Sequence, residues 1–329
     1  MSVRDSQFLA RWHAERDNYG RWGEFIVRHI KELLAAKLDP KQAAYFVRIP
    51  ATPRLKDDES LLQKAFYRPK NYSDPYVEIE DKVGVRFVVL LSDDVKIVKE
   101  AILSESTVWS AIVARDHEEE IAENPYEFNY QSVHLILRSQ NGQQYSGFNI
   151  PDNLPCEVQV RTLLQHAYSE VSHDTLYKPS IKTTPAMKRA AAKSMALIEA
   201  TSDYFNALAS LIDDEVAPLK ALSKDLDALY AQIVGKPATA STSPLNHLLL
   251  DRYGRDVEWS EIENWFAGRK WIGERIKERA AQSASFRVPS VLLVYFCAKN
   301  FPHGTPINCP LPENDLELVY GDLGDSLNG

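Results

Sequence analysis

The chain has 329 residues, enough for about two domains, and its 44% hydrophobic and 26% charged residues are typical of a globular protein and exclude a disordered or collagen-like chain. Its 38 lysine and arginine residues against 46 aspartate and glutamate residues give a net charge of −8, which excludes a general electrostatic attraction to nucleic acid or an anionic membrane, so a polyanion would need a local basic patch. The three cysteines lack the C-x-x-C spacing of a zinc cluster and no apolar run reaches membrane-spanning length, so we expect reduced thiols and a cytoplasmic location.

The first part of the chain is predicted to be helical. Apolar residues recur at helical spacing over residues 8–34, which predicts one or two helices. Gly20 and Gly23 lie inside this stretch, and each glycine costs a helix about 1 kcal/mol relative to alanine. Further on, residues 54–68 have a Ser-Leu-Leu centre between basic ends, which indicates a second, short helix.

A change from helical to strand-like patterns marks the start of a sheet. Residues 83–91 are nearly continuously apolar and rich in β-branched side chains, as expected for a buried strand. Ser92 then provides a helix N-cap, and Thr162 provides another. This region is predicted to contain a strand at 83–91, a helix at 95–102, strands at 108–115, 130–138 and 156–161, and a helix from residue 162 to about residue 177. This order predicts an α+β fold with a mixed β-sheet rather than a doubly wound parallel sheet.

The remaining chain has helical spacing throughout. Apolar residues from Met187 to Ile212 share one helical face, and Pro218 is expected to open a second helix because proline is favoured in a first helical turn. Residues 235–244 have the sequence GKPATASTSP, a composition typical of a linker. Aromatic and apolar clusters around Trp265 and at residues 291–296 are expected to be buried against the preceding domain or against another subunit.

One predicted strand carries polar side chains on a single face. In the strand at 156–161, Glu157, Gln159 and Arg161 alternate with apolar residues and therefore project to the same side. Their carboxylate, amide and guanidinium groups give this face of the sheet the chemistry of a polar site.

A second carboxylate, that of Asp81, lies just before the strand at 83–91, and basic residues lie on both sides of it. Carboxylate oxygens bind Mg²⁺ and cations bind phosphates, so two carboxylates from different strands ringed by cations indicate a Mg²⁺–nucleotide site. A solvated sheet face with salt bridges produces the same pattern, so the residues alone leave both interpretations open. The basic residues are Arg54, Lys56, Lys64 and Arg86.

Four sequence blocks resemble, in order and spacing, the synthetase domain of the RelA/SpoT family. The blocks are RLKDDESLLQK at 54–64, IEDKVGVRF at 79–87, NYQSVH at 129–134 and CEVQVRT at 156–162, followed by AYSEVSHDTLYK at 167–178. The resemblance implies a nucleotidyltransferase-like α+β domain that transfers the β,γ-pyrophosphate of ATP to a ribose 3′-hydroxyl and releases AMP, with Mg²⁺ as cofactor.

The resemblance also implies a domain organisation. We expect an N-terminal helical segment at 1–47, the synthetase domain at 48–180, and a helical C-terminal region at 181–329 with a linker near 235–244. Because only about 50 residues precede the first block, we expect no counterpart of the hydrolase domain that long family members carry. The chain is in this respect similar to a small alarmone synthetase.

Individual residues take their expected roles from the matched blocks. Asp81 matches the family's metal-binding aspartate, and Glu157 matches the glutamate that helps to bind Mg²⁺ and activates the 3′-hydroxyl. Tyr130 matches the tyrosine that stacks on the acceptor's guanine, although Tyr130 and His134 could instead belong to a half-buried strand edge. The other matches are Arg54, Lys56, Ser60, Lys64 and Arg86 for ATP, Arg115 and His134 for the acceptor, and Gln159, Arg161, His173 and Lys178 as supporting residues.

The acceptor-binding segment departs from the family pattern. Alarmone-making members carry two lysine-containing motifs there, whose lysines hold the 5′-phosphates of GDP or GTP. In this chain Arg115 and Asp116 partly match the first motif, whereas Tyr126 and Glu127 stand in the region of the second lysine. The departure weakens the expected contact with the acceptor's phosphates.

The function implied first is that of a GTP pyrophosphokinase, which makes the alarmone (p)ppGpp from ATP and GDP or GTP. One alternative is a toxin-type small alarmone synthetase that pyrophosphorylates the tRNA 3′ end. Another is an inactive module that senses nucleotides or serves as a scaffold, against which the presence of both Asp81 and Glu157 argues. The expected partners are therefore ATP and a guanosine nucleotide or tRNA, with no membrane, and a second copy or a regulatory protein could bind the C-terminal helices.

Overall fold

The computed structural model describes residues 2–68, 71–128, 132–175 and 183–327. The chain divides into two compact units, Met1–Leu208 and Ala209–Gly329, and each has a hydrophobic core of its own. The domain limits expected at residues 48 and 180 are drawn from the family resemblance and not from compactness. They therefore remain a prediction.

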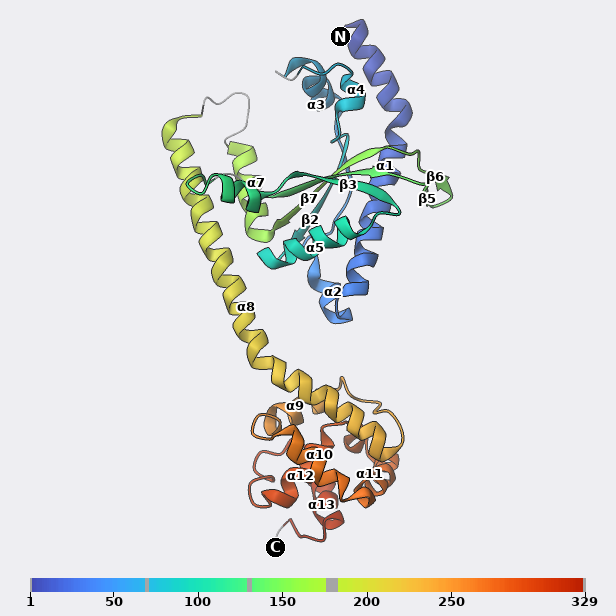
Figure 1. Ribbon diagram of the computed structural model, residues 1–329, viewed down its shortest axis with the longest axis vertical. Helices are drawn as coiled ribbons and strands as arrows, with labels where there is room; N and C mark the ends of the chain where they lie inside the picture. The colour runs from blue at the N-terminus through green and yellow to red at the C-terminus, as the bar shows by residue number, and fades with distance from the viewer. Residues whose placement is uncertain (1, 69–70, 129–131, 176–182, 328–329) are drawn as a thin grey trace. The chain divides into compact units, whose positions relative to one another are not determined.

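The first unit contains a sheet and its covering helices (Figure 1). The helices are α1 (Val3–Lys37), α2 (Pro40–Phe46), α3 (Asp58–Leu62), the π-helical η1 (Gln63–Tyr67), α4 (Pro75–Glu78), α5 (Ser92–Ser104), α6 (His117–Glu123), α7 (Leu163–Thr175) and the N-terminal part of α8 (Pro185–Val234). The strands are β1 (Arg54–Leu55), β2 (Val83–Val89), β3 (Trp109–Arg115), β4 (Val133–Ser139), β5 (Gln144–Tyr145), β6 (Phe148–Asn149) and β7 (Pro155–Thr162).

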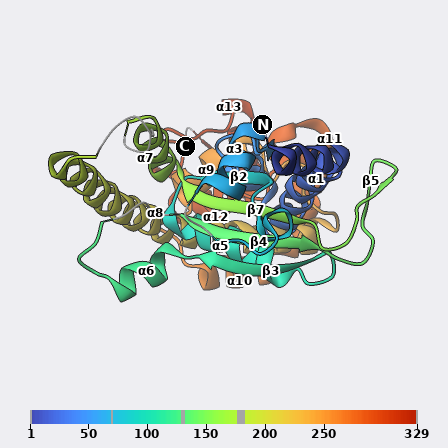
Figure 2. The same ribbon diagram turned by 90° about the horizontal axis from the view of Figure 1, so that it is seen from above.

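Five strands form one mixed sheet in the order β1-β2-β7-β4-β3. Strands β2 and β7 pair in parallel, whereas the other neighbouring pairs are antiparallel. Figure 2 shows β2, β7, β4 and β3 side by side in this order. The mixed sheet with its helices confirms the predicted α+β fold class.

The two faces of the sheet differ in chemistry. Helices α1 and α5 both contact β2 and β7, and α1 also contacts α5, so these helices cover one face. Their core includes Trp22, Phe87, Leu135 and Val158, all fully buried. Because side chains alternate along a strand, the residues between these core positions point to the other face, which carries the functional side chains.

Helix α1 is a single helix of 35 residues in spite of its two internal glycines. A Cβ atom added to Gly23 would lie only 2.5 Å from Cβ of Pro53 and 3.0 Å from a methyl group of Val83. The glycine thus lets the helix approach the sheet closely, and the resulting burial outweighs its weak helix propensity.

We expect Gly23→Ala to lower the free energy of unfolding by about 2 kcal/mol, because its methyl group would overlap a tightly packed wall. Gly20→Ala is the matched control on the same helix, since its added Cβ would have Leu55 at 3.8 Å as its nearest neighbour. This control should gain roughly 0.5 to 1 kcal/mol from helix propensity. Urea unfolding of both variants measures the difference, and equal stability of the two would contradict this account of the contact.

The predicted short helix at 54–68 is partly wrong. Arg54 and Leu55 instead form β1, which pairs with Gly84 and Val83 of β2. The helix begins only at Asp58, because the side chain of Asp57 caps it by accepting a hydrogen bond from the Ser60 amide at 2.8 Å. Arg54 is therefore placed by the edge of the sheet rather than by a helix.

The second unit consists of helices around one apolar core. Its elements are the C-terminal part of α8 (Pro185–Val234), α9 (Pro244–Tyr253), α10 (Trp259–Ala267), α11 (Lys270–Gln282), the 3₁₀-helical η2 (Ala284–Arg287), α12 (Val291–Asn300) and α13 (Glu313–Asp322). Trp265 and residues 291–296 lie inside this core, so the apolar clusters are buried within their own unit and need no partner for their burial. Among the described residues, no helix is both long enough and apolar enough to span a membrane.

The expected helix start at Pro218 is wrong, because α8 continues through this residue. A proline inside a helix removes one backbone hydrogen bond and disfavours the helix by about 3 kcal/mol. Directly after it, Leu222, Leu226 and Leu229 are buried in the core of the second unit, and their burial offsets this penalty. The predicted linker at 235–244 lies inside the same unit, where it connects α8 to α9.

Candidate functional site

The register of the sheet aligns four polar residues across four strands. Arg86 of β2 lies opposite Gln159 of β7, Gln159 lies opposite His134 of β4, and His134 lies opposite Arg115 of β3. Glu157, two residues before Gln159 on β7, points to the same face. The sequence predicted only the alternation within one strand, whereas the pairing extends the polar face across the sheet.

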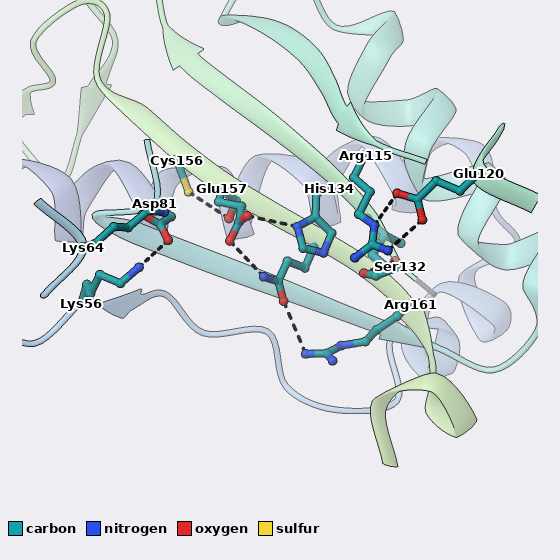
Figure 3. Close-up of polar contacts among 12 residues, drawn as sticks. Lys56, Lys64, Asp81, Arg115, Glu120, Ser132, His134, Cys156, Glu157 and Arg161 are labelled. Atoms are coloured by element: carbon teal, nitrogen blue, oxygen red, sulfur yellow. Dashed lines mark hydrogen bonds and ion pairs between the residues drawn. The ribbon is translucent and has the colours of Figure 1, made fainter. Parts of the chain in front are cut away.

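Glu157 lies at the centre of this face and is held on two sides. His134 Nδ1 is 3.1 Å from Glu157 Oε1, and the Gln159 amide donates a hydrogen bond of 2.9 Å to Oε2 (Figure 3). Burial by itself raises the pKa of this carboxyl group, but the contact with His134 outweighs it, and the pKa is lowered below its ordinary value. Glu157 is therefore a fixed carboxylate at neutral pH.

The supporting residue Arg161 is fully buried at the end of the same strand. Its guanidinium group donates a hydrogen bond of 3.4 Å to the Gln159 side-chain oxygen, and this oxygen belongs to the amide that holds Glu157. Arg161 is thus linked to Glu157 through the side chain of Gln159.

Asp81 lies next to Glu157, between two lysine side chains (Figure 3). Lys56 forms an ion pair with Asp81 Oδ2, and Lys64 Nζ lies 2.8 Å from Asp81 Oδ1. Burial raises the pKa of Asp81, but the two ammonium groups outweigh it and hold the pKa below its ordinary value. The two carboxylates of the site are therefore both ionised, and each is stabilised by its own partners.

Lys82 follows Asp81 and was missed by the sequence analysis. It is almost fully buried, its ammonium group donates a 2.7 Å hydrogen bond to the carbonyl of Ile79, and it lies over the rings of Tyr19 and Tyr76. Burial lowers its pKa to about 8. Lys82 thus anchors the bend between Asp81 and the start of β2.

A cavity of about 540 Å³ opens beside the two carboxylates, on the β1 and β2 side of the sheet. Of the five residues predicted to bind ATP, four line this cavity and Lys64 contacts Asp81 at its edge. His166 of α7 also lines it, and burial together with Arg161 and Arg86 lowers its pKa, so its imidazole is neutral at neutral pH. The lining includes Arg54, Lys56, Ser60, Asp81, Arg86, Glu157, Gln159 and His166.

The predicted acceptor residues lie on the other side of Glu157. His134 contacts Glu157 directly, and Arg115 at the end of β3 forms two short ion contacts with Glu120 of α6, at 2.6 and 2.7 Å. Neither residue lines the cavity. Tyr130 lies outside the described residues.

Two predicted supporting residues cannot be placed with side chains. His173 belongs to α7, but the described part of that helix does not include its side chain, and Lys178 lies outside the described residues. The sequence analysis also missed Glu120 and Glu170, which hold Arg115 and Arg86. The i, i+4 spacing of His166 and Glu170 on one helix was the available signal for the latter.

The donor set of this site fits a hard divalent cation. Asp81 and Glu157 present carboxylate oxygens, which Mg²⁺ prefers, and Mg²⁺ is usually held by one or two carboxylates together with substrate phosphates and water. In the described part of the chain, no group of three or more histidine, cysteine or acidic residues could hold a metal ion.

Comparison with known proteins places these residues in a family region. Residues 53–182 match the family model described as the region found in RelA/SpoT proteins. No curated protein matches the chain.

Several solved structures are similar to a part of this chain. The small alarmone synthetase 1 from Bacillus subtilis is 21% identical with a TM-score of 0.50, and the match covers 62% of this chain and 98% of that one. The same synthetase bound to its product pppGpp is 21% identical with a TM-score of 0.49, over 63% and 99% of the two chains. A GTP pyrophosphokinase family protein from Streptococcus pneumoniae is 18% identical with a TM-score of 0.49, over 65% and 97%. The first of these likenesses shows a shared fold.

Proposed function

We propose that this chain, whose residues 53–182 match the model of the region found in RelA/SpoT proteins, is a GTP pyrophosphokinase-like transferase that uses ATP as donor. In this proposal the β,γ-pyrophosphate of ATP moves to the ribose 3′-hydroxyl of GDP or GTP and yields an alarmone. The observation that carries it is the pair Asp81 and Glu157, which line one cavity together with the basic residues Arg54, Lys56 and Arg86.

Glu157 is the residue suited to activate the acceptor. Its carboxylate is ionised and is held by His134 and Gln159, so it can accept the proton of a 3′-hydroxyl group placed beside it. The hydroxyl oxygen then forms a bond to the β-phosphorus of ATP, the bond from that phosphorus to the oxygen bridging the α-phosphate breaks, and AMP leaves with the electron pair. The cations around the cavity stabilise the charge on the transferring phosphates.

A Mg²⁺ ion would be held by Asp81 and Glu157 and would supply neutralisation of the phosphate charge. Asp81 would then exchange part of its contact with Lys56 or Lys64 for the ion, and the released ammonium groups would face the phosphates. Support for this role comes from the hard oxygen donors and from the basic residues beside them.

Arg54→Ala and Arg86→Ala should each weaken the binding of a non-hydrolysable ATP analogue about tenfold, because each removes a charged hydrogen-bond donor from the cavity wall. Binding of GDP should change little. Arg28→Ala is the control, since Arg28 pairs with Glu32 on the exposed side of α1. Calorimetric titration of each variant measures both affinities. An unchanged affinity for the ATP analogue would contradict the proposed contact of these arginines with ATP.

The proposal also includes the identity of the acceptor. A guanosine nucleotide is our first choice because Arg115 and His134 lie beyond Glu157 on the same sheet face, where a nucleotide joined through its 3′-hydroxyl would extend. One observation favours the tRNA 3′ end instead: Glu120 already pairs with Arg115, so that arginine is less available to a terminal phosphate.

A panel of acceptors decides between these choices. Transfer of label from γ-labelled ATP is measured to GDP, GTP, adenine nucleotides and bulk tRNA under one set of conditions. We expect labelled GDP or GTP products. Labelling of tRNA with none of GDP or GTP would overturn the choice of acceptor while leaving the donor chemistry in place.

The proposed setting is the cytoplasm. Cys156, Cys297 and Cys309 are free thiols, in keeping with a reducing compartment. A second copy or a regulatory protein bound through the C-terminal helices remains part of the proposal.

A further inference from the structure

Arg115 and Glu120 form an ion pair at the β3 side of the polar face, where we propose that the acceptor binds. Arg115 Nε lies 2.6 Å from Glu120 Oε1, and Arg115 Nη2 lies 2.7 Å from Glu120 Oε2, so the contact is bidentate (Figure 3). A guanidinium group binds a phosphate with the same two-pronged geometry. The Glu120 carboxylate therefore occupies the position that two phosphate oxygens would take.

Helix α6 holds Glu120 in this position. The side chain of Asp116 caps the helix by accepting a 3.0 Å hydrogen bond from the Glu118 amide, and Lys99 of α5 pairs with the buried Asp116. Glu118 is paired separately, with Lys96 of α5 at 3.2 Å. The helix is thus fastened to α5 through its first turn, and Glu120 on the following turn contacts Arg115.

The contact between Arg115 and Glu120 is relevant to acceptor binding because of where Arg115 lies relative to Glu157. Arg115 and His134 lie in register with Gln159 of β7, and Glu157 lies two residues further along β7. With strands about 4.8 Å apart and a rise of about 3.3 Å per residue, the backbones of Arg115 and Glu157 are roughly 12 Å apart. An acceptor whose 3′-hydroxyl lies at Glu157 would bring its 5′ phosphates toward Arg115.

We propose that Glu120 is an internal competitor for the acceptor's phosphates and so sets selectivity by the number of phosphates that an acceptor carries. An acceptor's phosphate competes with the carboxylate for Nε and Nη2 of Arg115, and the negative charge of Glu120 stays close to the bound phosphates. The proposal rests on the proposed function, because it takes a guanosine nucleotide as acceptor.

The direct test is Glu120→Gln, compared with the wild type for GMP, GDP and GTP. At the partly exposed positions of this pair, removal of one negative charge should lower the KM for GTP about tenfold, with a smaller gain for GDP and little change for GMP. The kcat values should change less than about twofold, since Glu120 does not touch the reacting atoms.

The matched control is Glu118→Gln on the same helix. It removes the same charge but leaves Arg115 and Glu120 paired, so KM should change less than about twofold for every acceptor. In a chain that already carries Arg115→Ala, Glu120→Gln should lower the KM for GTP less than it does in the wild type, because only the repulsion between Glu120 and the phosphates is left to remove. Equal effects of the two glutamine variants, or a gain that does not follow the number of phosphates, would overturn the proposal.

Binding measurements separate this proposal from the proposed function. Calorimetry without ATP measures the affinity for GDP and GTP even if no transfer occurs. Tighter GTP binding by Glu120→Gln without transfer in the wild type would refute the proposed function and keep the role of Glu120. Transfer in the wild type with unchanged nucleotide binding in Glu120→Gln would refute the role of Glu120 and keep the function.

Discussion

Glu157→Gln is expected to reduce pyrophosphate transfer by about a thousandfold or more while the protein stays folded. The amide has nearly the same shape as the carboxylate, so the contacts with His134 and Gln159 can largely persist. It cannot accept the proton of the 3′-hydroxyl and is a poorer Mg²⁺ ligand, so it loses two contributions to the transition state at once. Single-turnover rates of AMP release, measured at saturating nucleotide, give the size of the loss.

The matched control for this variant is Glu80→Gln. Glu80 also forms a close ion pair, with Arg138 at 2.6 Å, but it does not line the cavity. Its replacement should change the transfer rate less than about threefold, as for an ordinary half-exposed salt bridge. A Glu157→Gln enzyme with more than a tenth of the wild-type rate would remove Glu157 from the catalytic role.

The second large effect is expected for Asp81→Asn, which should lower transfer about a hundredfold and also destabilise the fold. The side chain of Asp81 is only 20% exposed and pairs with both Lys56 and Lys64. A neutral amide leaves two ammonium groups close together without a compensating charge, so we expect a loss of about 2 kcal/mol in the free energy of unfolding. Urea unfolding and transfer rates measure the two effects separately.

The loss of stability in Asp81→Asn is expected to depend on pH. The folded-state pKa of Asp81 is lowered below its ordinary value of 3.8, so its contribution to stability is fully present above about pH 3.8 and is lost as the pH falls through the folded-state pKa. The stability difference between wild type and Asp81→Asn should therefore shrink below that pH. Asp93→Asn, at an exposed pair with Lys96, is the control and should cost less than 1 kcal/mol. A pH-independent difference between wild type and Asp81→Asn would contradict the ion-pair explanation.

The polar face of the sheet was accessible from the sequence to the extent that it depends on strand periodicity. Alternation alone placed Glu157, Gln159 and Arg161 together, and the structure links them through hydrogen bonds. The neighbours across the sheet could not be derived this way, because a one-residue change of register would turn every side chain of a strand to the opposite face. Thus the opposition of Gln159 and His134 became visible only with the pairing of β7 and β4.

Other features of the structure could not be predicted from the sequence because they depend on tertiary contacts, which override local propensity. Pro218 signals a helix start by its own chemistry, yet the buried leucines that follow it keep α8 continuous. Arg115 was expected to be available to phosphates, but its pairing with Glu120 requires the local fold of the β3 to α6 connection. Nothing in the sequence pattern distinguished Glu120 from the neighbouring Glu118 and Glu119, whereas the structure gives Glu120 a specific contact.

The most direct test of the central claim is the identity of the nucleotide products. Purified protein is incubated with Mg²⁺, ATP and either GDP or GTP, and the products are quantified by anion-exchange chromatography and mass spectrometry, with Glu157→Gln as a parallel sample. The account predicts one AMP for each acceptor that gains a pyrophosphate on its 3′-oxygen, and about a thousandfold less of this product from the Glu157→Gln sample in the same time. Formation of ADP with a singly phosphorylated acceptor, or AMP formation that is equally fast without Glu157, would contradict it.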